Sequence, residues 1–303
     1  MESRPSEIIE GVAGDRPWHR LEDRYIQAGD VRTRYWQQGS QGSNLVLLHG
    51  LGSYLDSWCL NIGEFARRYR VYAPDLLGHG YTDKPQVSYS LDCFVTFLSD
   101  FLSALGLDRT HLVGHSWGGA VALRFAEQYP ERVERLVLAG SPGLGPNVAL
   151  WLRLLTLPFF NTNAARVGRR ILKIASRTVI VRPEKRTPEW IGMTQERMKI
   201  SEVRAVVRAV ARKYLRLRGL RPEVMEMIRT QLPELRVPTL VIHGLNDWLI
   251  PPSNVAFAKT LNPTLEVKLL ERCGHELQYE CAEEFNQAVL EFLAGPADLH
   301  SRT

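Results

Sequence analysis

A serine flanked by glycines stands in the sequence GHSWGG of residues 114–119, directly after the short apolar run 111–113. Small residues two positions before and after Ser116 permit a tight turn from a strand into a helix that presents the hydroxyl. A serine hydroxyl becomes a useful nucleophile only when a base takes its proton. A glycine-rich turn with no chemistry has the same pattern, but the strand before it and the helix after it favour a nucleophile.

Candidates for the base, and for a group that orients the base, follow two later apolar runs. His275 lies just beyond the run 266–270, and Asp247 lies just beyond the run 239–243. Loops at the carboxyl ends of parallel strands meet in one crevice, so residues this far apart in sequence can reach Ser116. Either residue alone would be interpreted as a turn residue. The order Ser, Asp, His at three strand ends predicts a nucleophile, acid and base that act together.

Attack on a carbonyl creates an oxyanion, which needs hydrogen-bond donors held in place. The sequence HGLG of residues 49–52 follows the first expected core strand, and its glycines let the backbone approach a substrate. We expect the backbone N–H groups of Leu51 and Trp117 to be the donors. Three other histidines are interpreted as structural loop residues: His49, His79 and His243.

Short apolar runs alternate with longer amphipathic stretches, a pattern that predicts a parallel sheet with helices on both faces. The expected strands are 45–49, 70–73, 110–113, 133–139, 239–243 and 266–270, with an earlier antiparallel strand at 32–37. The expected helices are 58–69, 90–105, 117–129, 253–261 and 282–293.

The alternation stops after residue 139 and resumes at residue 237. The residues between are mostly helical in pattern, with one weak strand signal at 178–181. We interpret them as a helical cap inserted between two halves of one α/β core. The expected organisation is an N-terminal extension (1–30), the core (31–142 and 231–295), the cap (143–230) and a C-terminal tail (296–303).

Five segments together resemble the capped branch of the α/β-hydrolase superfamily. They are HGLG (49–52), APDLLGHG (73–80), GHSWGG (114–119), GLNDWLIP (244–251) and CGHELQYE (273–280). The resemblance covers about residues 31–293 and is least specific in the cap. It implies the α/β-hydrolase fold, a mostly parallel central sheet flanked by helices.

The resemblance also assigns roles, with Ser116 as nucleophile, His275 as base and Asp247 as acid. It implies an oxyanion hole made by the amides of Leu51 and Trp117. Some relatives carry the acid after the sixth strand, but the sequence AGSP of residues 139–142 has no carboxylate there. Asp247 therefore remains the one candidate acid.

Relatives with other chemistry differ at these positions. Haloalkane dehalogenases and most epoxide hydrolases have Asp in place of Ser116, and proline iminopeptidases tend to have an acidic cap. We therefore expect a serine hydrolase that cleaves carboxylic esters through an acyl-enzyme on Ser116, with no cofactor and no metal. Carbon-carbon bond hydrolases of anionic ring-cleavage products share the implied fold and residues and remain an alternative, as does a slow-turnover ligand-binding protein.

Candidate substrate-binding residues are Trp151, Phe159 and Trp248, although core packing explains Trp151 and Phe159 equally well.

Charge is divided unevenly along the chain. Residues 143–230 contain 19 Lys and Arg against 6 Asp and Glu, a balance of +13, whereas the remainder is −8 and the total is +5. Arginines recur every four residues at 204, 208, 212 and 216, and a second basic group covers Arg166, Arg169, Arg170, Lys173 and Arg177. Like charges at this spacing weaken a helix. The stripes therefore favour an anionic substrate or an anionic membrane surface as partner, against the simpler interpretation of a solvated face.

Length and composition exclude other classes of protein. The chain has 303 residues, 45% hydrophobic and 23% charged, which is typical of a globular domain. Its longest apolar run, 148–160, is shorter than the about twenty residues that cross a bilayer. Four cysteines without a CxxC pair are expected to be reduced thiols in a cytoplasmic protein. We expect a small-molecule substrate, and no nucleic acid, because no nucleic-acid-binding motif accompanies the basic charge.

Overall fold

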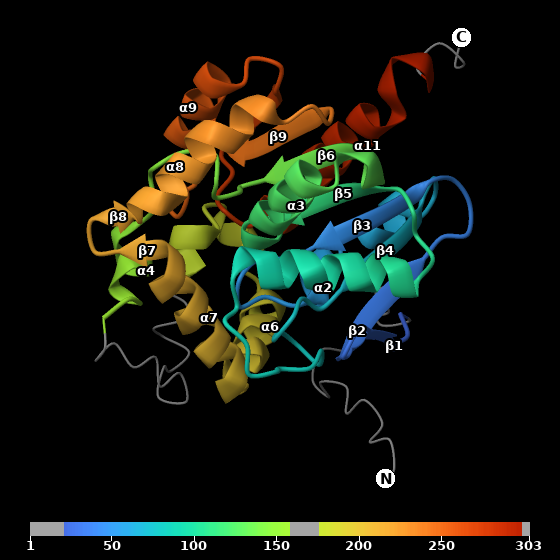
Figure 1. Cartoon of the computed structure of the whole chain (residues 1–303), viewed down its shortest axis with the longest axis horizontal. Coiled ribbons are helices and arrows are strands. Elements are labelled where there is room, and N and C mark those ends of the chain that lie inside the picture. Colours follow the sequence, from blue (N-terminus) through green and yellow to red (C-terminus); the bar gives the residue numbers. More distant parts are fainter. Residues whose placement is uncertain (1–20, 158–175, 299–303) are drawn as a thin grey trace.

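A central sheet organises the residues that the computed structural model describes, 21–157 and 176–298 (Figure 1). Its strands follow the order β1-β2-β4-β3-β5-β6-β9-β10, and neighbours from β4 to β10 run parallel. The pairs β1–β2 and β2–β4 are antiparallel. The bounds are β1 Arg24–Ala28, β2 Val31–Gln38, β3 Asn44–Leu48, β4 Arg70–Pro74, β5 Thr110–His115, β6 Val133–Ala139, β9 Thr239–Gly244 and β10 Glu266–Leu270.

Helices cover both faces of this sheet, as the alternating pattern requires. In β3, Val46 and Leu48 belong to one buried cluster, whereas Leu45 and Leu47 belong to another. The first cluster includes residues of α2 (Leu91–Ala104), α3 (Trp117–Gln128) and α9 (Ser253–Leu261). The second includes residues of α1 (Ile62–Phe65), α10 (Leu277–Glu280) and α11 (Ala282–Asp298). The predicted α/β-hydrolase fold, with a mostly parallel sheet between helices, is confirmed.

Two predictions in the N-terminal half need correction. Strand β1 lies within residues 1–30, which were expected to be an extension, and it pairs with β2 over its whole length. The helix expected over 58–69 is broken into the 3-10 turn η2 (Leu55–Trp58) and the short α1. The side chain of Asn61 lies between them and donates to Gln278 O at 2.9 Å and Asn286 Oδ1 at 2.7 Å. These bonds to the C-terminal helices hold the break.

We call residues 143–230 the cap segment. Its described elements lie over the carboxyl ends of the parallel strands (Figure 1). The weak strand expected at 178–181 is absent, because residues 176–179 are helical. The described elements are α4 (Leu150–Leu154), η5 (Pro183–Lys185), α6 (Pro188–Lys199), α7 (Ser201–Tyr214), β7 (Leu215–Arg216), β8 (Gly219–Leu220) and α8 (Pro222–Gln231).

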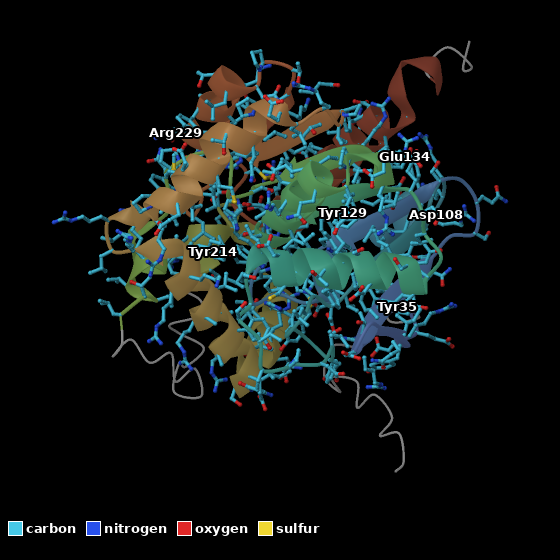
Figure 2. All side chains as sticks on the ribbon, in the orientation of Figure 1. Tyr35, Asp108, Tyr129, Glu134, Tyr214 and Arg229 are labelled. Atoms are coloured by element: carbon cyan, nitrogen blue, oxygen red, sulfur yellow. A yellow bond between two sulfur atoms is a disulfide. The ribbon has the colours of Figure 1, made fainter. Side chains whose placement is uncertain are left out.

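Helix α7 is amphipathic and packs its apolar face onto the core through Val203, Val206 and Val210. Its Tyr214 accepts a 2.5 Å hydrogen bond from Leu91 N of α2, and the labelled side chain is seen at this junction in Figure 2. The cap segment is therefore joined to the core by packing as well as by the chain.

The arginine stripe of α7 is not one continuous exposed face. Arg212 and Arg216 are exposed, whereas Arg204 and Arg208 are half-buried. Of the second basic group, Arg166, Arg169, Arg170 and Lys173 lie outside the described residues, and Arg177 is exposed. None of the described helices is long and apolar enough to cross a membrane.

The cysteine prediction is wrong for one pair. Cys273 and Cys281 form a disulfide with their Cα atoms 6.4 Å apart. Helix α10 turns the chain back between them, a contact that a sequence separation of eight residues does not reveal. Cys59 and Cys93 are free thiols.

Candidate active site

Ser116 lies at the sharp turn between β5 and α3. Its backbone has φ 49° and ψ −120°, a conformation that costs energy for a residue with a side chain. The turn is possible because its neighbours lack side chains. A Cβ atom on Gly118 would lie 2.2 Å from Leu48 O, and one on Gly114 would lie 2.4 Å from Gly118 O. The predicted strand-to-helix turn around Ser116 is therefore what the backbone forms.

The three residues expected to act together lie in hydrogen-bonding contact. His275 Nε2 is 3.0 Å from Ser116 Oγ, and His275 Nδ1 is 2.7 Å from Asp247 Oδ2. The other carboxylate oxygen, Asp247 Oδ1, accepts from Leu249 N at 2.8 Å and Ile250 N at 2.9 Å. The carboxylate is thus fixed in the direction that orients the imidazole. In this arrangement a serine hydroxyl can pass its proton to Nε2 as it attacks a carbonyl.

The charges of the pair reinforce this orientation. Burial alone lowers the pKa of His275, but the charge of Asp247 and the hydrogen bond to it outweigh burial, so the pKa is raised above 6.5. Burial works against the charged form of Asp247 too, yet its contacts with His275 and His243 leave its pKa below the usual value. Asp247 therefore stays ionised, and a carboxylate in this position can stabilise a protonated imidazole at His275.

The histidines interpreted as structural bind the backbone of the loops. His49 Nε2 accepts from Leu76 N at 2.9 Å, and His79 is likewise buried and bonded to Leu77 O. His243 Nε2 lies 2.8 Å from Ile250 O and so holds the loop that carries Asp247. Burial lowers the pKa of His79 to about 4, so this ring is neutral near pH 7.

A cavity of about 430 Å³ opens beside Ser116 and His275. Most of its lining is apolar, and it runs between the core and the cap segment. Leu51 and Trp117, whose amides are the expected oxyanion donors, both line it next to Ser116. Trp117 is the first residue of α3, where backbone N–H groups have no partner within the helix. Both residues therefore border the cavity, and the role of their amides stays a prediction.

The three candidate substrate-binding residues differ in their position relative to the cavity. Trp151 of α4 is 41% exposed and lines the cavity. Phe159 lies outside the described residues. Trp248 does not line the cavity and is 67% exposed, because Asp247 turns into the site and its neighbour therefore points to solvent. The position of Trp248 gives no support to its expected role in substrate binding.

Sequence reasoning missed a buried arginine on the cavity wall. Arg197 of α6 is only 6% exposed, and its Nη2 and Nε both donate to Asp56 Oδ1, at 2.5 and 3.1 Å. Its Nη1 has no hydrogen-bond partner among the described residues. Glu276, next to His275, also lines the cavity and favours the charged form of Arg197. A single arginine on a helix forms no repeating pattern, whereas the arginines that recur every four residues do. The sequence therefore did not single out Arg197.

A second histidine stands behind the base. His115 Nε2 lies 2.8 Å from His275 O, and the two rings are 5.0 Å apart between centroids. Burial lowers the pKa of His115 to about 4, so it is neutral and leaves the charge of Asp247 to His275. It occupies the variable position before Ser116 in the GxSxG motif, which is the signal that could have identified it.

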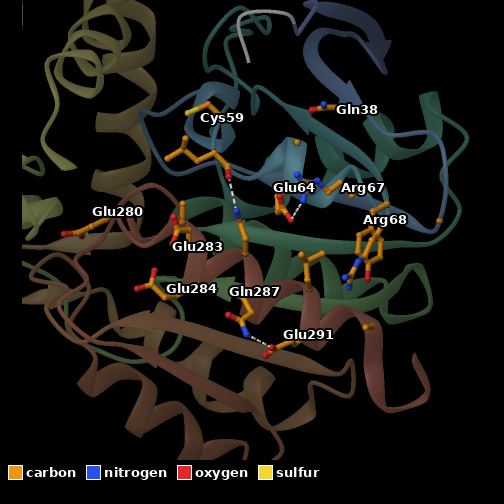
Figure 3. Close-up of a pocket in the computed structure, with 18 of the residues that line it drawn as sticks. Gln38, Cys59, Glu64, Arg67, Arg68, Glu280, Glu283, Glu284, Gln287 and Glu291 are labelled. Atoms are coloured by element: carbon orange, nitrogen blue, oxygen red, sulfur yellow. Dashed lines mark hydrogen bonds and ion pairs between the residues drawn. The ribbon is translucent and has the colours of Figure 1, made fainter. Parts of the chain in front are cut away.

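A larger hollow of the described surface lies elsewhere. It measures about 1450 Å³ and lies between α1 and α11, where charged side chains form contacts such as Arg67–Glu64 at 3.1 Å and Gln287–Glu291 at 2.8 Å (Figure 3). None of Ser116, Asp247 and His275 lines it. Size alone does not identify the site, because the serine, the imidazole and the carboxylate that contact one another lie at the smaller cavity.

We found no candidate metal-binding group of side chains in the part of the chain that is described. Three or more His, Cys, Asp or Glu side chains do not gather there in an arrangement that could hold a metal ion. The chemistry that the described site offers is that of the serine, the imidazole and the carboxylate.

Comparison with known proteins agrees with this geometry. Residues 44–282 match the family model described as the alpha/beta hydrolase fold. The chain is 31% identical to the 2-hydroxy-6-oxo-6-(2'-aminophenyl)hexa-2,4-dienoic acid hydrolase of Metapseudomonas resinovorans, over 91% of this chain and 92% of that protein. It also resembles the crystal structure of a meta-cleavage product hydrolase from Pseudomonas fluorescens IP01, with a TM-score of 0.75, 26% identity and coverage of 89% and 97%. A bacterial membrane phospholipase A gives a TM-score of 0.77, 27% identity and coverage of 91% and 86%.

Proposed function

Because this chain belongs to the α/β-hydrolase family, we propose that it cleaves a carbon-carbon bond next to a ketone in an anionic, ring-cleavage-type dienoate. Ser116 Oγ adds to the ketone carbon and His275 takes its proton. The bond to the neighbouring carbon then breaks, and its electron pair leaves on the conjugated fragment, which takes a proton. Water hydrolyses the remaining acyl-serine to a carboxylic acid.

One observation carries this choice of substrate. Arg197 is a buried cation on the wall of a mostly apolar cavity, and its Nη1 is not used by Asp56. A planar guanidinium suits a carboxylate, and the relative from Metapseudomonas resinovorans is named for a dienoic acid. The ester hydrolysis expected from sequence is thereby the second candidate rather than the first.

We assign the oxyanion hole to the amides of Leu51 and Trp117. Both residues line the cavity beside Ser116. Preorganised amides of this kind stabilise the charge that develops on the former carbonyl oxygen. The same group would serve a ketone and an ester, since both give a tetrahedral oxyanion.

Ester hydrolysis keeps support from the apolar lining of the cavity and from the likeness to the membrane phospholipase A. The experiment that separates the two candidates compares a 6-oxo-dienoate with neutral p-nitrophenyl esters, first on the unmodified protein and then on Arg197→Lys. The proposal requires turnover of the dienoate and a KM for it that rises in Arg197→Lys. The KM for a neutral ester should be the same in Arg197→Lys as in the unmodified protein. Equal changes for both substrates, or turnover of esters alone, would favour the ester.

A membrane surface is the proposed partner of the basic hairpin β7–β8. Arg216 and Arg218 of the hairpin and Arg212 at the adjoining end of α7 are exposed, and Leu217 at the tip is 46% exposed. Leu215 of the hairpin and Leu152 of α4 pack against the same buried cluster of Val148, Leu249 and Ile250, and Trp151 of α4 is 41% exposed. Basic and apolar side chains together favour an anionic lipid surface. We further propose that residues 143–230 act as the cap that admits the substrate.

A further inference from the structure

The cavity does not end near the reacting atoms. From Ser116 it continues along α3 and beneath α8 of the cap segment. On α3 it is lined by residues three or four positions apart, which share one face of a helix. The wall residues beyond the serine are Trp117, Ala120, Leu123, Arg124 and Glu127 on α3, and Val224, Met227, Ile228 and Gln231 on α8.

Polar side chains close the far end of this arm. Arg124 Nη1 donates to Gln231 Oε1 at 2.7 Å and lies 3.4 Å from Glu127 Oε2, which joins α3 to α8. The Arg124 and Glu127 side chains are only 21% and 11% exposed. Burial raises the pKa of Glu127 to about 7, although Arg124 opposes this. Before this polar end, the wall of α8 is aliphatic.

The arm is long for a ring-cleavage product with a small acyl group. Eleven residues separate Ser116 from Glu127, and a helix rises about 1.5 Å per residue, so the arm extends about 16 Å along α3. With bonds of about 1.5 Å, an extended aliphatic chain advances about 1.25 Å per carbon. The polar end begins nearer to the serine, at Arg124, which is eight residues from Ser116 and so about 12 Å along α3. A length between about 12 and 16 Å fits an aliphatic chain of about ten to twelve carbons.

The arm and Arg197 lie on different sides of the cap segment. Helix α6, which carries Arg197, and helix α8 stand at opposite ends of α7 (Figure 1). A carbonyl carbon at Ser116 can therefore have one substituent toward the guanidinium and the other toward α8. The substituent toward α8 meets apolar wall and stays on the serine as the acyl group.

We propose that the seam between α3 and α8 binds an aliphatic acyl arm of about ten to twelve carbons, whose length is limited by the group Arg124, Glu127 and Gln231. This inference rests on the proposed reaction at Ser116, but it concerns only the acyl side of the broken bond. It therefore holds for a ketone and for an ester.

The unmodified protein provides the first test, with p-nitrophenyl esters from acetate to palmitate. Each buried methylene should raise kcat/KM about threefold to fourfold from butyrate toward decanoate. The series should then fall beyond the dodecanoate, where the polar end blocks the chain. A series that is flat or falls from butyrate onward, or an aromatic acyl group preferred over decanoate, overturns the inference.

A blocking variant gives the second test. Met227→Trp places a large ring in the arm, and Glu226→Trp is the matched control, because Glu226 is exposed and does not line the cavity. Met227→Trp should lower the ratio of kcat/KM for decanoate to that for butyrate at least about tenfold, while Glu226→Trp leaves the ratio unchanged. An unchanged ratio in Met227→Trp overturns the inference. If that variant fails to fold, Val224→Phe tests the same wall.

Binding separates this inference from the proposed reaction. Calorimetry with n-alkylboronic acids, which bind a serine without turnover, should show affinity rising with chain length to about ten carbons. Length-dependent binding without turnover of any ester or dienoate would contradict the proposed function and support the arm. Turnover together with binding that does not depend on chain length would support the proposed function and contradict the arm.

Discussion

The backbone N–H of His275 donates a 2.8 Å hydrogen bond to the carbonyl oxygen of Val179. The loop that carries the proposed base is thus tied to the cap segment. Glu280 strengthens the connection, because its buried carboxylate accepts from Gly274 N at 2.6 Å and from Arg182 N at 2.5 Å. The position of the cap segment and the position of the imidazole are therefore coupled.

Glu280→Gln should disturb this coupling. A side-chain amide presents an NH₂ group to one of two N–H donors, so one buried hydrogen bond is lost, which costs about 1–3 kcal/mol. We expect a lower melting temperature, a kcat lowered about tenfold or more, and a shifted midpoint of the pH profile, since Glu280 acts by positioning His275. Glu284→Gln is the matched control, because Glu284 is exposed and contacts the Arg182 side chain at 3.4 Å. A lower melting temperature with unchanged kcat and pH profile would mean that Glu280 is only structural.

The pH dependence should follow His275. Its pKa lies above 6.5 because the charge and hydrogen bond of Asp247 outweigh burial, and only the neutral ring can accept the serine proton. The value of kcat/KM should therefore be low in acid and rise with pH through a single ionisation above 6.5. A pH–rate profile on a neutral ester measures this. A rise centred well below 6.5 would contradict the assignment.

Ser116→Ala should abolish covalent labelling by a fluorophosphonate. It should lower kcat by several orders of magnitude, because nucleophile and base act as a unit. The fold should persist, since the Ser116 side chain makes its contact with His275 Nε2 rather than with the core. Mass spectrometry after labelling measures the result. Full labelling of the alanine variant would show that another residue is the nucleophile.

Asp247→Asn should be nearly as damaging, for a geometric reason. Asp247 Oδ1 accepts two backbone N–H groups, so an Asn would keep its oxygen there and turn its NH₂ toward His275 Nδ1. The ring would then carry its proton on Nε2 and could not accept one from Ser116. We expect kcat to fall about thousandfold or more while fluorophosphonate labelling becomes slow. Labelling at the unmodified rate would argue against Asp247 as the orienting group.

Sequence reasoning succeeded where the evidence is local. The strands of the core are short apolar runs, and residues such as Asp247 and His275 follow strand ends, so parallel topology alone brings them toward Ser116. The glycines around Ser116 indicate a turn in which the backbone atoms approach too closely for a Cβ atom to fit. These features could be predicted because each depends on a few neighbouring residues.

The missed features depend on contacts between distant segments. Arg124 and Gln231 are 107 positions apart, and Arg197 reaches Asp56 across 141 positions. Nothing near either arginine in sequence indicates its partner, because the orientation of the cap helices decides which side chains meet. The disulfide between Cys273 and Cys281 was missed for another reason, since the two are only eight positions apart and the turn of α10 decides whether they meet.

The proposed membrane contact predicts an effect of charge reversal on the hairpin. Arg212→Glu combined with Arg216→Glu changes two exposed side chains outside the Ser116 group. Attraction to anionic lipid is screened over about 8 Å at physiological ionic strength, so the reversals and high salt should both weaken it. Co-sedimentation with vesicles that contain anionic lipid should therefore fall in the variant, and neutral vesicles should bind little in either case.

The matched control for this experiment reverses Arg67 and Arg68, which are also exposed but lie beside α1 at the other hollow (Figure 3). Both double variants change the net charge by the same amount, so a general effect of net charge would lower binding equally in the two. A specific surface predicts loss of vesicle binding only when Arg212 and Arg216 are reversed. Turnover of a soluble neutral ester should stay unchanged in both. If binding ignores lipid charge, salt and both pairs of reversals, the basic hairpin is a solvated surface and the membrane proposal fails.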